Sequence, residues 1–423
     1  MPVRKILKLA VALLLPAITA HAGSFTTLHR FAGAPDAADP ISRLVFIGGT
    51  LYGTTFYGGP VNRGTVFSVN ATSGKEKLLY SPVSQESDPT DPQYPAAALL
   101  SLSGKLYGTS YWGGSSGASD ACLGAGCGTV FSVDPATGAE SVVYSFLGGT
   151  DGELPQGGSL IAHLGVVYGT TYNGGNGVCS NGCGTVFSLN PNTGAETVLY
   201  QFQGTQNSAG PFDGTYPESA LIYHNGALYG ATAEGGNVSS DGCAGNGCGV
   251  IFKVNATTGV EKLLYMFANG ADGAYPNGPM AFYTGEIYGT AAAGGATCGC
   301  GTVFEIKAST GAQTTLYSFT GGNDGNYPNG IIRKGVFLYG TTQNGGGSGC
   351  GGNGCGTVFS VNRTTGVETV LYRFTGGSDG GVPMGALVYN GGALYGTTQS
   401  GGTGTCDFGN SDLGCGTVFK LIP

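Results

Sequence analysis

The sequence predicts an all-β protein: a single seven-bladed β-propeller with four-stranded blades, spanning residues 23–423. Three observations support this prediction. One phrase of alternating strand and turn residues recurs seven times, and the strand missing from the last copy stands before the first. In addition, no helical periodicity follows the N-terminal segment.

Each repeat contains a phrase like LYGTT, a glycine-rich gap and a phrase like GTVFSVN, followed in all but the last repeat by a turn and a phrase like ETVLYxF. The first phrase begins at Leu51, Leu106, Val167, Leu228, Ile287, Leu338 and Leu394. The GTVF-like phrase begins at Gly64, Gly128, Gly184, Gly249, Gly301, Gly356 and Gly416. Short runs of β-branched and aromatic residues between Gly, Asn and Asp predict strands. Because these runs are apolar on both sides, as in Val142–Phe146, we expect blades packed face to face.

The last repeat supplies only three strands, expected at Ala386–Tyr389, Leu394–Thr398 and Gly416–Leu421. The segment Ser24–Phe31, SFTTLHRF, matches the fourth-strand phrase Glu368–Phe374. We therefore expect this N-terminal outer strand to complete the C-terminal blade. Such a closure joins the ring and removes exposed sheet edges.

Residues 1–22 have the features of a signal peptide: three basic residues, an apolar run at Leu9–Ala20, and Ala20-His21-Ala22 before Gly23. The apolar run is too short for a membrane helix, so no membrane span is expected after cleavage. The sequence thus predicts a secreted protein, extracellular or periplasmic, and a monomer. The net charge is −8 and no basic patch occurs, which excludes nucleic acid as an expected partner.

Twelve cysteines fall in pairs within the gaps between the second and third strands, and the first repeat has none. In a secreted chain such local pairs predict disulfides. The pairs are Cys122 with Cys127, Cys179 with Cys183, Cys243 with Cys248, Cys298 with Cys300, Cys350 with Cys355, and Cys406 with Cys415. Bonding of Cys298 with Cys300 stays open, because one intervening residue makes a tight ring.

No metal or other cofactor is expected. Zinc is the alternative to the disulfides, but it needs four ligands, and each loop offers two cysteines with no histidine nearby. Calcium is a further alternative, because Gly321–Asn326, GGNDGN, offers oxygen ligands. The spacing of that segment differs from the known calcium-loop pattern.

An aspartate precedes a proline by four residues in each connection between repeats: Asp36, Asp91, Asp151, Asp213, Asp272, Asp324 and Asp379. Seven carboxylates around a channel mouth could bind cations or act as acid and base. Alternatively, each aspartate stabilises a turn by accepting hydrogen bonds from the backbone. The turn interpretation is favoured, because every repeat has the residue and catalytic sites usually break repeat symmetry.

Candidate binding residues are those that depart from the repeat. They lie after the second strand or in the long loops: Phe56, Tyr57, Tyr111, Trp112, Tyr172, Glu234 and Phe408. In a propeller these loops and the connections between blades emerge on one face, near the axis. Aromatic side chains on a rigid platform suit sugar stacking or protein contacts. The alternative is that they only cover the glycine-rich loops.

No catalytic motif of the nucleophile-elbow, zinc-protease or phosphate-loop type occurs, so no catalytic residue is assigned. The favoured hypothesis is a non-catalytic binding, adhesion or structural protein that presents its stapled loops to a glycan or an extracellular protein. The alternative is an extracellular propeller enzyme, a polysaccharide lyase or glycoside hydrolase. It would use carboxylates of the loops, such as a ring aspartate with Glu234.

The phrase LYGTTxxGG followed by GTVF and TGxETVLYxF resembles bacterial extracellular tandem repeats of the GloVer type, found in choice-of-anchor proteins. The resemblance covers essentially all of residues 24–423. It implies a secreted or surface-displayed protein of unassigned activity, often tethered by a sorting tail. The printed sequence departs from that pattern by ending on GTVFKLIP.

Overall fold

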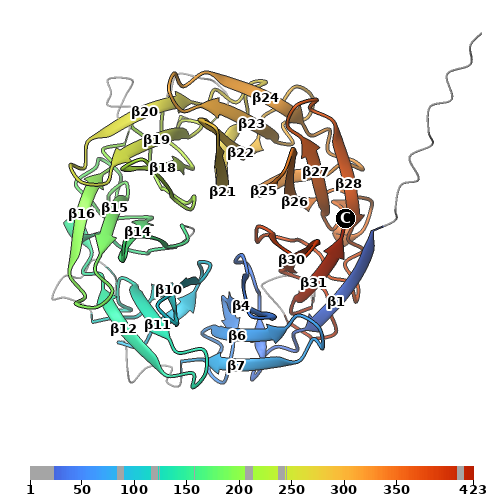
Figure 1. Ribbon diagram of the computed structural model, residues 1–423, viewed down its shortest axis with the longest axis horizontal. Coiled ribbons are helices and arrows are strands. Elements are labelled where there is room, and N and C mark those ends of the chain that lie inside the picture. Colours follow the sequence, from blue (N-terminus) through green and yellow to red (C-terminus); the bar gives the residue numbers. More distant parts are fainter. Residues whose placement is uncertain are drawn as a thin grey trace, which may run out of the picture.

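The computed structural model describes residues 23–82, 90–115, 122, 124–156, 158–204, 213–236, 243, 245–406 and 414–423. The expected signal peptide at 1–22 and the candidate Phe408 lie outside these ranges. Across the described ranges, seven antiparallel sheets stand around a central axis (Figure 1). The predicted seven-bladed β-propeller is confirmed.

Every blade has four strands, which follow one another from the axis to the rim. Blade 1 contains β3 (Val45–Ile47), β4 (Thr50–Thr55), β6 (Thr65–Asn70) and β7 (Glu76–Tyr80). Blade 2 contains β9 (Leu100–Leu102), β10 (Lys105–Trp112), β11 (Thr129–Val133) and β12 (Glu140–Ser145), and the short β8 (Gln93–Pro95) also pairs with β10. Blade 3 contains β13 (Ile161–His163), β14 (Val166–Thr171), β15 (Thr185–Leu189) and β16 (Glu196–Gln201). Blade 4 contains β17 (Ile222–His224), β18 (Ala227–Thr232), β19 (Val250–Asn255) and β20 (Glu261–Met266).

The remaining blades follow the same order. Blade 5 contains β21 (Ala274–Tyr283), β22 (Glu286–Ala293), β23 (Thr302–Lys307) and β24 (Gln313–Ser318). Blade 6 contains β25 (Asn326–Lys334), β26 (Phe337–Asn344), β27 (Thr357–Asn362) and β28 (Glu368–Arg373). Blade 7 contains β29 (Val388–Asn390), β30 (Ala393–Thr398), β31 (Thr417–Ile422) and β1 (Ser24–Arg30). A two-residue ribbon, β2 (Ala37–Ala38) with β5 (Tyr57–Gly58), lies beside blade 1.

The ring closes as predicted, because the N-terminal strand β1 is the outer strand of blade 7. It pairs antiparallel with β31, from Ser24 opposite Ile422 to Arg30 opposite Thr417. Figure 1 shows the first and last strands of the chain side by side in this blade. The Phe25 ring stacks on Tyr372 of blade 6, with centroids 3.8 Å apart. The two ends of the chain therefore share one sheet.

The core lies between neighbouring blades, where apolar side chains from both sheets meet. The wholly buried Phe187 of blade 3 packs with Phe146 of blade 2, their ring centroids 5.2 Å apart. The glycine of the LYG phrase makes room for this ring: a Cβ on Gly169 would lie 2.6 Å from Phe187 Cζ. The same glycine–phenylalanine contact recurs in each repeat, which explains why the two phrases recur together.

The glycine of the GTVF phrase explains the proline of each connection. Gly184 has a φ of 97°, which strongly favours glycine, and a Cβ there would lie 2.5 Å from Cδ of Pro217. At the ring closure, a Cβ on Gly416 would likewise lie too close to Cδ of Pro40. Each connection thus enters its blade against the third strand of the preceding blade.

The helical turns of the described ranges are short, as in η2 (Gly149–Asp151) and η3 (Cys350–Gly352). None of the described helices has the length and hydropathy that a membrane crossing requires.

Candidate functional site

The long loops between second and third strands lie on one face together with the connections between blades. In blade 3, the carbonyl of Cys183 accepts a hydrogen bond of 3.0 Å from the amide of Tyr216, the residue before Pro217. The opposite face holds the tight turns, where the Ala256 amide donates to the Gly226 carbonyl over 2.9 Å. We call the first face the loop face.

Six disulfides staple the loop face. The predicted pairing is confirmed for Cys122–Cys127, Cys179–Cys183, Cys243–Cys248, Cys350–Cys355 and Cys406–Cys415, and the bond left open between Cys298 and Cys300 is present. The carbonyl of the second cysteine in each pair accepts a hydrogen bond from the amide of the residue before the proline of the next connection. In the first repeat, which has no cysteine, the Arg63 carbonyl accepts the corresponding hydrogen bond from the Tyr94 amide. Each staple thus fixes one point of the neighbouring connection.

The residue before each proline has a positive φ, between 53° and 63°, in all seven connections: Asp39, Tyr94, Leu154, Tyr216, Tyr275, Tyr327 and Val382. This conformation is uncommon for residues other than glycine, and a following proline disfavours helical backbone as well. Such strain persists only where the surrounding structure holds it. Four of these residues are tyrosines, and sequence reasoning missed them. The signal that could have found them is their fixed place before the proline.

Five aromatic side chains of blades 1 and 2 form one connected group, which we call the aromatic wall: Phe56, Tyr57, Tyr94, Tyr111 and Trp112. The Tyr94 ring lies 5.0 Å from Phe56 and 5.4 Å from Trp112, centroid to centroid. Tyr111 and Trp112 are 5.3 Å apart. All five are partly exposed. Four of the predicted binding residues therefore meet, with Tyr94 between them.

A second aromatic pair continues this surface. The Tyr172 ring stacks on Tyr216 with centroids 4.5 Å apart and planes inclined by 13°. Burial raises the pKa of Tyr172 to about 12, and the nearby charges of Glu218 and Glu234 contribute. Tyr111 is a further neighbour of Tyr172. The predicted residue Tyr172 thus lies beside the aromatic wall, and the predicted Glu234 lies near Tyr172.

A cavity of about 380 Å³ opens on the axis, and we call it the axial cavity. It is lined mainly by the residues that follow the prolines of the connections, and Phe56 of the aromatic wall lines it too. Its charged lining residues are Arg43 and Glu218. Sequence reasoning missed both, although each stands where most other connections have small or amide side chains.

The two charged groups of the axial cavity have no partner among the described residues: neither Arg43 nor Glu218 makes a side-chain hydrogen bond or ion pair there. Both keep surface that solvent or a ligand can reach, since Arg43 is exposed and Glu218 is half-buried. The surrounding protein nevertheless desolvates them: it lowers the pKa of the Arg43 guanidinium and raises the pKa of Glu218 to about 7, with a further contribution from the charge of Glu234. A partly desolvated charge loses some of its hydration, so a ligand that supplies hydrogen-bond partners would be favoured in this cavity.

Amide side chains complete the polar lining. Gln343 Nε2 donates to Asn329 Oδ1 over 2.9 Å, and Asn329 Nδ2 donates to the Pro383 carbonyl over 2.9 Å. Asn277 Oδ1 is buried without a hydrogen-bond partner in the described ranges. Burial also raises the pKa of Asp39, two residues before the lining residue Ile41, to about 6 against a hydrogen bond from Gln399. The cavity therefore offers donors and acceptors of the kind that bind hydroxyl groups.

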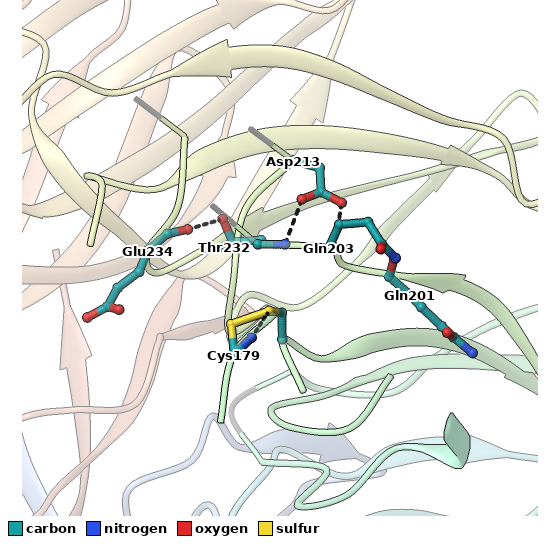
Figure 2. Close-up of a disulfide and its surroundings, with 8 residues drawn as sticks. Cys179, Gln201, Gln203, Asp213, Thr232 and Glu234 are labelled. Carbon is teal, nitrogen blue, oxygen red and sulfur yellow. Dashed lines mark hydrogen bonds between the residues drawn. A yellow bond between two sulfur atoms is a disulfide. The ribbon is translucent and has the colours of Figure 1, made fainter. Parts of the chain in front are cut away.

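The seven aspartates of the connections lie elsewhere, against the outer strands. Asp213 accepts a hydrogen bond from the Gln203 amide over 2.8 Å (Figure 2). It also accepts from the Gly204 amide over 3.0 Å and from the Tyr200 hydroxyl over 2.6 Å. Asp91, Asp151, Asp272, Asp324 and Asp379 likewise accept from an outer-strand tyrosine. Asp36 accepts from the Ala32 amide over 2.9 Å and has His29 in place of the tyrosine. None of the seven lines the axial cavity.

Glu234 is held by its backbone, with its side chain directed away from Asp213 (Figure 2). The Thr232 hydroxyl donates to the Glu234 carbonyl over 2.8 Å. Asn246 Nδ2 donates to Oε1 over a long 3.4 Å. The carboxylate of Glu234 thus lies near enough to Glu218 to raise the pKa of Glu218 by charge repulsion, whereas Asp213 contacts the outer strand through Tyr200.

A family model described as a Gloeobacter/Verrucomicrobia repeat matches residues 15–243, 122–353 and 213–409. No curated protein matches the chain. Among solved structures, an oligogalacturonate lyase in complex with manganese is similar over 95% of this chain and 96% of its own, at 12% identity and a TM-score of 0.55. An oligogalacturonate lyase from Vibrio parahaemolyticus covers 96% of this chain and 94% of its own, at 10% identity and a TM-score of 0.51. At these identities the likeness shows the propeller fold.

Proposed function

We propose that this chain, which belongs to the Gloeobacter/Verrucomicrobia repeat family, binds glycans at the axial mouth of its loop face and acts outside the cytoplasm. The observation that carries the proposal is the aromatic wall beside the axial cavity. Six disulfides support an oxidising compartment.

Stacking on aromatic rings suits sugars, because the sugar ring presents an apolar face while its edge carries hydroxyl groups. The aromatic wall supplies the faces, and Glu218 and Asn277 supply polar groups in the lining of the adjoining cavity. Pockets of this kind combine apolar and aromatic lining with a few placed polar groups. The rigid, stapled surroundings reduce the ordering cost of binding.

The proposal is tested on a glycan array with the wild-type protein and Trp112→Ala. We expect retention of at least one glycan class, and binding about tenfold weaker in the variant, because a partly exposed indole face of the wall is lost. Phe337→Ala is the matched control, since Phe337 is an exposed aromatic residue remote from the wall, at the start of β26. Absence of any glycan ligand, or equal binding by wild type and Trp112→Ala, would overturn the proposal.

Cleavage of the bound glycan is a second candidate function, favoured by the position of Glu218 in the lining of the axial cavity, where burial and the nearby charge of Glu234 raise its pKa to about 7. A carboxyl with a raised pKa beside a second carboxylate suits acid–base work on a glycosidic bond. Turnover of an array-identified glycan, abolished by Glu218→Gln and retained by Asp379→Asn, would establish this activity. Unchanged glycan after prolonged incubation would exclude it for that ligand.

A further inference from the structure

We infer that the glycans bound at the axial mouth bear a carboxylate, and that Arg43 is the residue that recognises it. This inference rests on the proposed glycan binding and names its ligand class. The observation behind this inference is that the Arg43 guanidinium has no partner in the described part of the chain. It lines the same cavity as Phe56, a partly exposed member of the aromatic wall.

Arg43 follows Pro40 in the connection that enters blade 1, and its side chain lines the axial cavity with Phe56. The neighbouring Ser42 is hydrogen-bonded. Its hydroxyl lies 2.7 Å from the Thr54 hydroxyl, and its carbonyl accepts a hydrogen bond from the Thr397 hydroxyl over 3.2 Å. The strand entry is therefore fixed, and the guanidinium is left to interact with whatever enters the cavity. A guanidinium fork matches a planar carboxylate with two parallel hydrogen bonds.

The rest of the cavity favours a single carboxylate on a hydroxylated ligand. Glu218 and the buried acceptor Asn277 Oδ1 suit hydroxyl donors, not further anions. The whole chain carries a net charge of −8, which opposes binding of a strongly polyanionic ligand. A sugar acid meets these conditions: its ring stacks on Phe56, its carboxylate reaches Arg43, and its hydroxyls face the amides and Glu218.

Glu218 makes this recognition dependent on pH. The groups around it are Glu234 after β18, Tyr172 after β14, Tyr216 of its own connection, and Arg43 and Asn277 elsewhere in the cavity. Deprotonation of Glu218 adds a negative charge to the cavity, whereas a sugar carboxylate keeps its charge throughout the neutral range. Binding of a carboxylated glycan should therefore strengthen as the pH falls through about 7.

The test is an array holding neutral, carboxylated, sulfated and amino glycans, read at pH 5.5 and pH 8. We expect carboxylated glycans to be retained preferentially and more tightly at pH 5.5. Arg43→Met should weaken their binding at least tenfold, the effect of losing charge-assisted hydrogen bonds of roughly 1.5–3 kcal/mol. Arg43→Lys should bind carboxylated glycans with an affinity between those of the wild type and Arg43→Met. Lys75→Met, which removes an exposed cation of blade 1 on the other face, is the matched control.

The outcomes separate this inference from the proposed function. If carboxylated and neutral glycans bind equally, if sulfated or amino glycans are preferred, or if Arg43→Met binds like wild type while Trp112→Ala is weakened, then the carboxylate assignment is wrong and glycan binding stands. If no glycan binds, both fail. Thermal unfolding of Arg43→Met, expected to match wild type, ensures that lost binding reflects the missing guanidinium.

Discussion

The seams between blades and the mouth of the axial cavity differ in how far they repeat. At the seams, one glycine, one phenylalanine and one aspartate occupy the same places in blade after blade, and most aspartates bind an outer-strand tyrosine. At the mouth, the corresponding positions change from blade to blade: Phe56, Tyr111 and Tyr172 become small or amide residues in later blades. The repeated seam residues therefore close and stabilise the ring, whereas the variable residues at the mouth are the ones available to contact a ligand.

The same difference divides the charged groups. Seam aspartates are satisfied by hydroxyl and amide donors, and they lie at the outer strands. Arg43 and Glu218 lack such partners among the described residues and line the cavity. Substitutions at seams should therefore change stability and leave binding intact, and substitutions at the mouth should do the reverse.

The largest effect should come from breaking the closing seam. Deleting residues 23–31 removes β1 and the wholly buried Phe31, and it leaves the edge of β31 unpaired. Truncating a buried phenylalanine alone costs roughly 3–5 kcal/mol, so the deletion should lower the midpoint of thermal unfolding by many degrees. Adding a peptide of this segment should recover part of the loss. A midpoint equal to that of the intact chain would refute ring closure by β1.

A smaller loss is expected when one ordinary seam is overpacked. In Gly169→Ala the new Cβ would lie 2.6 Å from Phe187 Cζ and 2.8 Å from Leu160, both buried. Overpacking of this kind costs roughly 1–3 kcal/mol, measurable by denaturant unfolding. Gly322→Ala is the control, because its Cβ meets nothing within 4 Å and its φ is not positive. Equal stability of the two variants would contradict the packing account of the LYG phrase.

The smallest seam effect should be a dependence of stability on pH. Burial and then the charge of Asp151 raise the pKa of Glu196 to about 8, and Glu76, Glu140, Glu261 and Glu368 are raised to about 7 in the same way. Because these folded-state values exceed those of the unfolded chain, the folded protein binds more protons. Their stabilisation is complete below about pH 4.5 and is lost as the pH rises through 7 to 8.

The unfolding midpoint should therefore fall between pH 5 and pH 9, and Glu196→Gln should make that fall shallower. Thermal unfolding in a buffer series measures both. A midpoint that rises over this interval, or a Glu196→Gln profile identical to that of wild type, would show that these carboxyl groups do not titrate as described.

The sequence predicted the blade count, the closing strand and the disulfides, because repeats, turn residues and cysteine spacing are local signals. It brought together Phe56, Tyr111 and Trp112 as departures from the repeat. It did not find Tyr94, Arg43 or Glu218, since their convergence depends on connections from different blades meeting at the axis. Nor did it find the tyrosine partners of the seam aspartates, which require knowing that each connection folds back on the outer strand.

The sole tryptophan of the chain, Trp112, belongs to the aromatic wall, which reaches the axial cavity at Phe56. The deciding measurement is a titration of its fluorescence with a carboxylated glycan retained on the array, alongside calorimetry. We predict that the emission changes and saturates at the ligand concentration where the binding heat saturates. Binding heat with unchanged Trp112 emission would place the ligand away from the axial mouth and contradict the assignment of that site.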